Sequence, residues 1–194
     1  MLSGDRDTVS SVLVEASIVR QMSDMIRAFR ISQIVGTIAQ LGIPDRLASG
    51  ARTASELASL IGCHTGATHR LMRAASDLGL VESGPDALFT LTALGHSLRS
   101  DVPGSVRDSA IALTSPGHWL PWGRLSVAVR TGRRQTVETL GAELFEYYSD
   151  NPAEGRAPPE QCLCPAWRWR AKSRAFSIHL RRSLWWTSVE RPAH

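Results

Sequence analysis

This chain of 194 residues contains little lysine, little cysteine and no long hydrophobic run. Its three cysteines (Cys63, Cys162 and Cys164) are too few for a disulfide framework. No run of 18 apolar residues occurs that could form a transmembrane helix, and residues 1–7 lack the basic-then-apolar order of a secretion signal. These absences predict a cytosolic protein that does not enter a membrane.

Positive charge is concentrated at one end of the chain. The formal net charge is +4, but residues 1–156 carry 15 arginines, no lysine and 16 acidic residues. Residues 157–194 hold seven basic residues, including Lys172, against two acids. The basic character therefore belongs to the last segment, and it gives no argument that the body binds nucleic acid.

The first part of the chain has the periodicity of amphipathic helices. Residues 9–41 are predicted to form two helices, because two apolar stripes follow the i, i+3, i+4, i+7 spacing. The first stripe is Met22, Met25, Ile26 and Phe29, and the second is Ile31, Ile34, Val35 and Ile38. A chain of this length has little core to cover both stripes, so the first is expected to face a partner subunit. An ordinary pair of helices within one chain is the alternative.

The next segment has the element order of a winged helix. A short helical turn is expected in "IPDRLASG", and a helix in "TASELASLIG", where Thr53 and Glu56 form a capping box and Gly62 ends the helix. A second helix follows in "ATHRLMRAASDLG", with Leu71, Ala74, Ala75 and Leu78 on one face. The two β-prone runs of "LVESGPDALFTLT" then predict a hairpin. Residues 103–156 are expected to be helical with breaks at Pro103, Pro116 and Pro121.

A winged helix suggests binding to DNA, and a DNA-binding transcriptional regulator is the alternative function. Arg70 and Arg73 would face phosphates and His69 a base edge. However, the wing "ESGPDA" is acidic, and phosphate contacts supply much of the affinity in such complexes. The prediction is therefore that the protein does not bind nucleic acid.

The sequence contains no recognisable catalytic centre. No metal site is predicted from the cysteines and histidines. The second ligand pair of a zinc finger is missing beside Cys63, His64 and His69, and no zinc-finger spacing occurs among Cys162, Cys164, His179 and His194 either. No nucleophile–base arrangement, Walker loop or G-x-G-x-x-G motif occurs. His118, Trp119 and Trp122 lie in a segment broken by Pro and Gly and could line a pocket, whereas aromatic packing between helices is the alternative.

Several motifs resemble one enzyme family over residues 29–156. They are "LGIPD", "TASELA", "LMRAASDLGLV", "FTLTALGHSLRSD" and "FEYYSDNPA". The chain is similar here to the N-terminal part of S-adenosylmethionine-dependent O-methyltransferases of the acetylserotonin, hydroxyneurosporene and polyketide type. The resemblance implies a winged-helix module for homodimerisation that helps to cover the substrate pocket. Its substrate-lining candidates are Met25, Phe29, His118, Trp119 and Trp122.

The last segment is interpreted as the start of the methyltransferase domain read out of frame. Tryptophan has one codon, so Trp185, Trp186 and the first bases of Thr187 spell Val-Asp when read one base earlier. The neighbouring codons then permit "VVDVGGA", the cofactor-binding strand and glycine turn of the resembled family. The alternative is that this basic, aromatic segment binds membranes or nucleic acid.

The fold expected from these observations is mainly α. It has a winged-helix dimerisation domain at 1–101, bridging helices at 102–156, and an out-of-frame, disordered tail at 157–194. The expected function is that of an O-methyltransferase family member that keeps the dimerisation and substrate-lid half and is inactive alone. Full-length relatives would methylate a hydroxyl group of a small metabolite, whereas no cofactor is expected to bind this chain.

Overall fold

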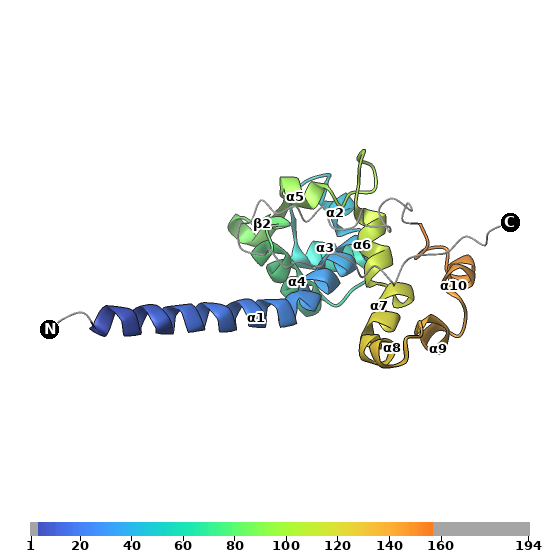
Figure 1. The fold of residues 1–194 in the computed structure, drawn as a ribbon. Coiled ribbons are helices and arrows are strands. Elements are labelled where there is room, and N and C mark those ends of the chain that lie inside the picture. The colour runs from blue at the N-terminus through green and yellow to red at the C-terminus, as the bar shows by residue number, and fades with distance from the viewer. Residues whose placement is uncertain (1–3, 157–194) are drawn as a thin grey trace. The chain divides into compact units, whose positions relative to one another are not determined.

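The computed structural model describes residues 4–156, with side chains from residue 16 onward. The chain divides after His96 into two compact units, each described by itself below (Figure 1). Both units are mainly helical, and the first also contains a small antiparallel sheet. The segment 157–194, which the sequence interpretation treats as an out-of-frame tail, lies outside the described residues.

The first unit begins with one long helix, α1 (Gly4–Gln40). The prediction of two helices over 9–41 was therefore wrong. At 100° per residue, the second apolar stripe lies about half a turn around the helix axis from the first. In the sequence, such a change of face looks the same as the end of one helix and the start of another. The backbone continues because no proline interrupts residues 9–41.

The C-terminal end of α1 packs into the core of the first unit. Ile38 and Ala39 are buried, Ile34 and Val35 are half-buried, and Ile31 remains exposed. α2 (Ile43–Leu47) follows after a left-handed Gly42. Contacts between α1 and both α2 and α4 fix this end of the helix.

Helix α3 (Ala54–Ile61) has the ends that the sequence predicts. The Thr53 hydroxyl accepts a hydrogen bond from the Glu56 N–H at 3.2 Å, and the Glu56 carboxylate accepts one from the Thr53 N–H at 2.7 Å. Hydrogen bonds that the Thr53 N–H and the Thr53 hydroxyl donate to the Glu56 carboxylate lower the pKa of Glu56 below its usual value. Gly62 ends the helix at φ 67°, a left-handed conformation that favours glycine.

Helix α4 (Thr65–Asp77) packs on α3 and on the hairpin. Its buried residues are Thr68, Met72 and Ala75, so the buried face is centred on Met72 and is rotated from the predicted one. A capping contact that the sequence interpretation missed starts the helix, since Nδ1 of His64 accepts a hydrogen bond from the Ala67 N–H at 3.3 Å.

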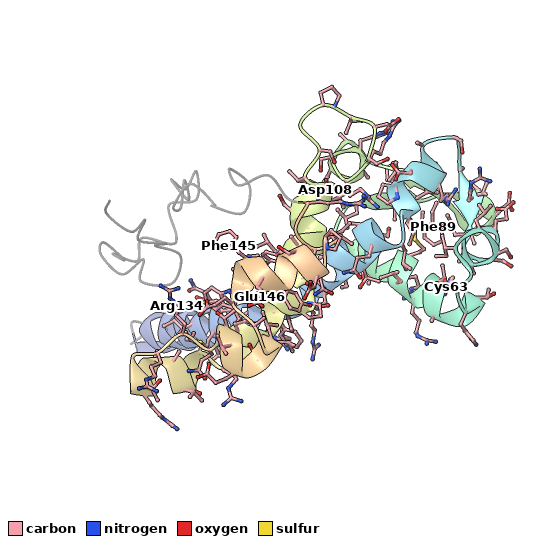
Figure 2. All side chains as sticks on the ribbon, turned by 90° about the vertical axis from the view of Figure 1, so that its right-hand side faces the viewer. Cys63, Phe89, Asp108, Arg134, Phe145 and Glu146 are labelled. Carbon is pink, nitrogen blue, oxygen red and sulfur yellow. The ribbon has the colours of Figure 1, made fainter. Side chains whose placement is uncertain are left out.

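The predicted hairpin is present as β2 (Val81–Ser83) and β3 (Leu88–Leu91), joined by a short turn over Pro85–Ala87. The sheet has three antiparallel strands in the order β1-β3-β2, with β1 (Arg52–Thr53) as an edge strand that was not predicted. Val81 pairs with Leu91. Phe89 of β3, labelled in Figure 2, is only 2% exposed and belongs to the core of the first unit.

Thr92 and Gly95 connect the end of the hairpin to α5 (Ala93–His96) through hydrogen bonds and close packing. The Thr92 hydroxyl donates to the Gly79 carbonyl at 2.6 Å and accepts from the Gly95 N–H at 3.1 Å. A Cβ atom on Gly95 would lie 2.1 Å from the Leu80 carbonyl oxygen. Only glycine fits there, which gives a physical reason for the "FTLTALG" motif.

The second unit consists of five short helices within the described residues 97–156. They are α6 (Arg107–Thr114), α7 (Pro116–Gly123), α8 (Leu125–Thr131), α9 (Thr136–Leu140) and α10 (Leu144–Asp150). Pro116 begins α7, but Pro121 lies inside it, so the predicted break at Pro121 was wrong. α7 contacts each of the other four helices and organises this unit.

Candidate functional site

The five substrate-lining candidates fall into two groups. Met25 and Phe29 lie on α1 of the first unit, and His118, Trp119 and Trp122 lie on α7 of the second. His118 and Trp119 are half-buried, whereas Trp122 is 61% exposed. Only His118 belongs to a polar cluster within its unit.

That cluster is built around Glu154 at the N-terminal end of α7. One carboxylate oxygen of Glu154 accepts a hydrogen bond from the Gly117 N–H at 3.0 Å. The other accepts one from the Tyr147 hydroxyl at 3.2 Å. The carboxylate therefore joins the start of α7 to α10, and its charge is favourable beside the positive end of the helix dipole.

His118 and Tyr148 form the second pair of the cluster. The Tyr148 hydroxyl and Nδ1 of His118 are hydrogen-bonded, and which group donates depends on the imidazole tautomer. Their rings stack at 5.9 Å between centroids and 27° between planes. Tyr147 meets Tyr148 edge to face, also at 5.9 Å. Hydrogen bonding and ring packing together hold the imidazole in place.

Two glycines allow this close packing. A Cβ atom on Gly117 would lie 2.9 Å from Cε1 of Tyr148, 3.0 Å from Cε1 of Tyr147 and 3.1 Å from a carboxylate oxygen of Glu154. A Cβ on Gly155 would lie 3.1 Å from Cβ of Tyr148. The spacing of "PGHW" and "EYYSDNPAEG" thus encodes one packed cluster, although the sequence interpretation took only His118 from it.

Burial governs the electrostatics of the cluster. Burial lowers the pKa of His118 below its ordinary value, against smaller opposing effects of the Glu154 charge and a backbone hydrogen bond with Ala112. Burial also raises the pKa of Tyr147, aided by the charge and hydrogen bond of Glu154. The lowered pKa favours a neutral His118 imidazole and the raised pKa a neutral Tyr147 phenol, and both groups can form hydrogen bonds with a small polar molecule.

The N-terminal part of α1 carries the second candidate feature, an apolar seam. We define the apolar seam as Ile18, Val19, Met22, Met25, Ile26 and Phe29. These six side chains are between 47% and 67% exposed. Figure 1 shows this half of α1 lying away from the other elements of the first unit. Contiguous apolar surface of this kind marks interaction sites in soluble proteins.

A third feature is a cavity of about 220 Å³ between α4 and the hairpin. Its lining includes His69, Arg73, Asp77 and Phe89. The acidic Asp77 shares the cavity with Arg73, which reduces its attraction for phosphate. No group of three or more potential metal ligands occurs among the described residues.

The residues of the described segment do not fit S-adenosylmethionine. In nucleotide-binding folds, that cofactor class is held by a parallel strand followed by a glycine turn and a helix. The only sheet within residues 4–156 has three short antiparallel strands, and its turn carries Pro85, Asp86 and Ala87. Within residues 4–156, no helix has an apolar stretch long enough to span a membrane.

Comparison with known proteins shows what the N-terminal part of the chain is similar to. Residues 23–101 match the family model of the O-methyltransferase dimerisation domain. A similar curated protein is the O-demethylpuromycin-O-methyltransferase of Streptomyces alboniger, 35% identical over 124 residues. That alignment covers 62% of this chain and 32% of the relative.

Solved structures give the same result. The mitomycin 7-O-methyltransferase superposes with a TM-score of 0.68 at 27% identity, over 74% of this chain and 43% of that one. Human N-acetylserotonin methyltransferase in complex with S-adenosylmethionine gives 0.64 at 27% identity, over 71% and 42%. The chain spans about a third of the length of the curated relatives it matches.

Proposed function

We propose that the chain supplies the dimerisation and substrate-lid half of an O-methyltransferase, because residues 23–101 match the family model of the O-methyltransferase dimerisation domain. In this proposal, residues 1–101 are a winged-helix dimerisation domain, residues 102–156 are bridging helices, and residues 157–194 are an out-of-frame tail. The order α3, α4, β2, β3 supports the winged-helix assignment.

The apolar seam is the observation that carries the proposed dimer. Each seam residue loses solvent only if a second surface covers it, and burying such a side chain is favourable by about 1.5–3 kcal/mol. The rest of the first unit leaves the seam exposed. A second copy of the same helix is a self-complementary cover, as a two-fold symmetric dimer requires.

The polar cluster supports the substrate-lid half of the proposal. His118 and Tyr148 present hydrogen-bonding groups beside the half-buried Trp119, a combination suited to a small molecule that carries a hydroxyl group. Trp122, on the same helix as Trp119, remains a proposed lining residue, whereas Met25 and Phe29 of the first unit are assigned to the apolar seam. Transfer of a methyl group to that hydroxyl would belong to a methyltransferase domain, because the described residues do not fit the cofactor.

Sedimentation of two matched variants tests the proposed dimer. The double variant Met25→Glu with Phe29→Glu places two charges in the seam, which should give monomers or aggregates. The control Arg20→Glu changes an exposed residue on the opposite face of α1 and should remain dimeric. A double variant that stays dimeric would refute pairing through α1.

A further inference from the structure

The apolar seam has the spacing of a coiled coil rather than of a broad apolar face. Ile18, Met22, Met25 and Phe29 are separated by four, three and four residues, as the a and d positions of a heptad are. With Met22 and Phe29 at a, Val19 and Ile26 fall at e. The seam therefore has a central row of four side chains and a second apolar row along one edge.

We infer that α1 pairs antiparallel with α1 of a second copy, with Ile18 opposite Phe29 of the partner subunit and Met22 opposite Met25 of the partner subunit. This inference rests on the proposed dimer and adds its direction and register. It requires one two-fold axis across the helix pair, near the midpoint between Met22 and Met25. Each contact then occurs twice, as in any isologous interface.

The edge of the seam decides the direction. In a parallel pair, an e position lies beside a g position of the other helix, so Ile26 would face the amide of Gln21 of the partner subunit. In an antiparallel pair, e positions lie beside e positions, so Val19 meets Ile26 of the partner subunit on one edge. The g positions, Gln21 and Ala28, then meet on the other edge. Only the antiparallel pair puts apolar against apolar and keeps the polar amide apart.

The central row decides the register. In the inferred register, all four layers place an apolar side chain opposite another. A shift by one heptad in one direction would place Met25 opposite position 15, which is glutamate, and Phe29 opposite position 11, which is serine. A shift in the other direction would place Met22 opposite Ser32 and Ile18 opposite Gly36, which is already buried in its own unit.

The charges on α1 agree with this arrangement. Arg20 and Arg27 fall at f and Asp24 at c, so these three lie away from the seam. Arg30 falls at b, and its guanidinium lies over the Phe29 ring, 5.7 Å from the ring centroid, at the end of the seam. Asp24 and Arg27 form a weak, exposed ion pair at 3.9 Å on the outer face. Antiparallel helices also place opposite ends of their dipoles together, which is favourable. No charged residue between positions 18 and 29 has to be buried.

Disulfide cross-linking of the full chain tests direction and register together. Cys63, Cys162 and Cys164 are changed to Ser, and Ile18→Cys and Phe29→Cys are introduced in separately tagged chains. At 1.5 Å per residue, positions 18 and 29 lie about 16 Å apart along the helix. A disulfide needs Cα atoms about 4.4–6.8 Å apart, so it distinguishes the two directions.

The expected result is a disulfide between the two differently tagged chains when they are mixed, and none within dimers of either variant alone. Disulfides within the Ile18→Cys dimer and within the Phe29→Cys dimer would overturn the inference and show a parallel pair. A dimer in sedimentation that forms neither product would overturn it too, because another surface would then hold the dimer. A monomer in sedimentation would instead refute the proposed function.

Discussion

Gly117 donates its backbone N–H to the carboxylate of Glu154 at 3.0 Å, although 37 residues separate them in the chain. The same carboxylate receives the Tyr147 hydroxyl, so one acidic side chain ties the start of α7 to α10. The second unit has few buried apolar side chains, with Leu98, Ala112 and Ala128 as its fully buried hydrophobic residues among those described. Polar contacts of this kind therefore add to the limited apolar packing of this unit.

Removing the Glu154 carboxylate should destabilise the second unit. Glu154→Ala leaves the buried Gly117 N–H and the half-buried Tyr147 hydroxyl without this partner, and a buried polar group left unpaired costs about 1–3 kcal/mol. Urea unfolding followed by tyrosine and tryptophan fluorescence measures the loss. The control Glu146→Ala removes an exposed carboxylate of α10 and should change the unfolding free energy by less than about 0.5 kcal/mol. Equal losses in the two variants would contradict the assigned role of Glu154.

A methyl group on Gly117 should also destabilise the cluster. In Gly117→Ala, the new Cβ would lie within 3.1 Å of Tyr148, Tyr147 and Glu154, and overpacking of this kind costs about 1–3 kcal/mol. Gly123→Ala in the same helix is the matched control, because nothing lies within 4 Å of its added Cβ. Thermal melting should show a lower Tm for the first variant only. An unchanged Tm for Gly117→Ala would mean that the tyrosine rings and Glu154 do not pack closely against Gly117.

The stability of the second unit should fall as the pH falls below about 6.5. Burial lowers the pKa of His118, so the unfolded chain binds a proton at this imidazole more readily than the folded chain. The contribution of the neutral imidazole to stability is therefore complete above the ordinary histidine pKa. It is lost as the pH falls from that value through the lowered pKa of His118 in the folded chain. Urea midpoints measured between pH 7.5 and 5 should decline, and His118→Gln should flatten this decline. If His69→Gln, an exposed control, flattens it equally, His118 is not the responsible group.

The purified chain should not bind S-adenosylmethionine. Residues 4–156 offer only an antiparallel sheet and no glycine turn after a parallel strand, so they lack the turn at which the backbone closely approaches such a cofactor. Calorimetric titration should give no binding heat, and the cofactor should leave the Tm unchanged. A micromolar site would contradict this prediction.

Duplex DNA should not bind the first unit in a salt-sensitive way. The hairpin that would enter a minor groove carries Glu82 and Asp86, and Asp77 lies beside Arg73 on α4. Negative charge at these positions opposes the phosphate contacts that such binding needs. Fluorescence anisotropy with a labelled duplex measures the affinity at several salt concentrations. Binding that disappears in Arg70→Ala with Arg73→Ala would support the regulator alternative instead.

The nucleotide sequence should reveal a displaced reading frame after codon 157. Inserting or deleting one or two bases there, whichever restores the shifted frame, should open a frame that runs through Val-Asp-Val-Gly-Gly. That frame should continue for about 100–200 residues, the usual size of a domain. Sequencing the genomic locus makes the comparison directly. A stop codon within a few dozen codons would refute the out-of-frame interpretation of residues 157–194.

The sequence by itself determined the local features whose cause is local. The Thr53–Glu56 capping box, the glycine end at Gly62 and the hairpin around Pro85 depend on residues a few positions apart, and the structure confirms each of them. The resemblance carried by short motifs is confirmed in the same way, because residues 23–101 match the dimerisation domain. Such features need no knowledge of what packs beside them.

Only the tertiary structure decided the features that depend on distant partners. The periodicity of residues 9–41 predicts two apolar faces. It does not distinguish two helices joined by a break from one continuous helix whose two parts face different surfaces, and the structure has the continuous helix. The contact of Gly117 with Glu154 has no local signal, because hydrogen bonds across 37 residues depend on how the intervening helices turn. Burial, which lowers the pKa of His118 and raises that of Tyr147, likewise follows from packing, since side-chain environment is a property of the folded chain.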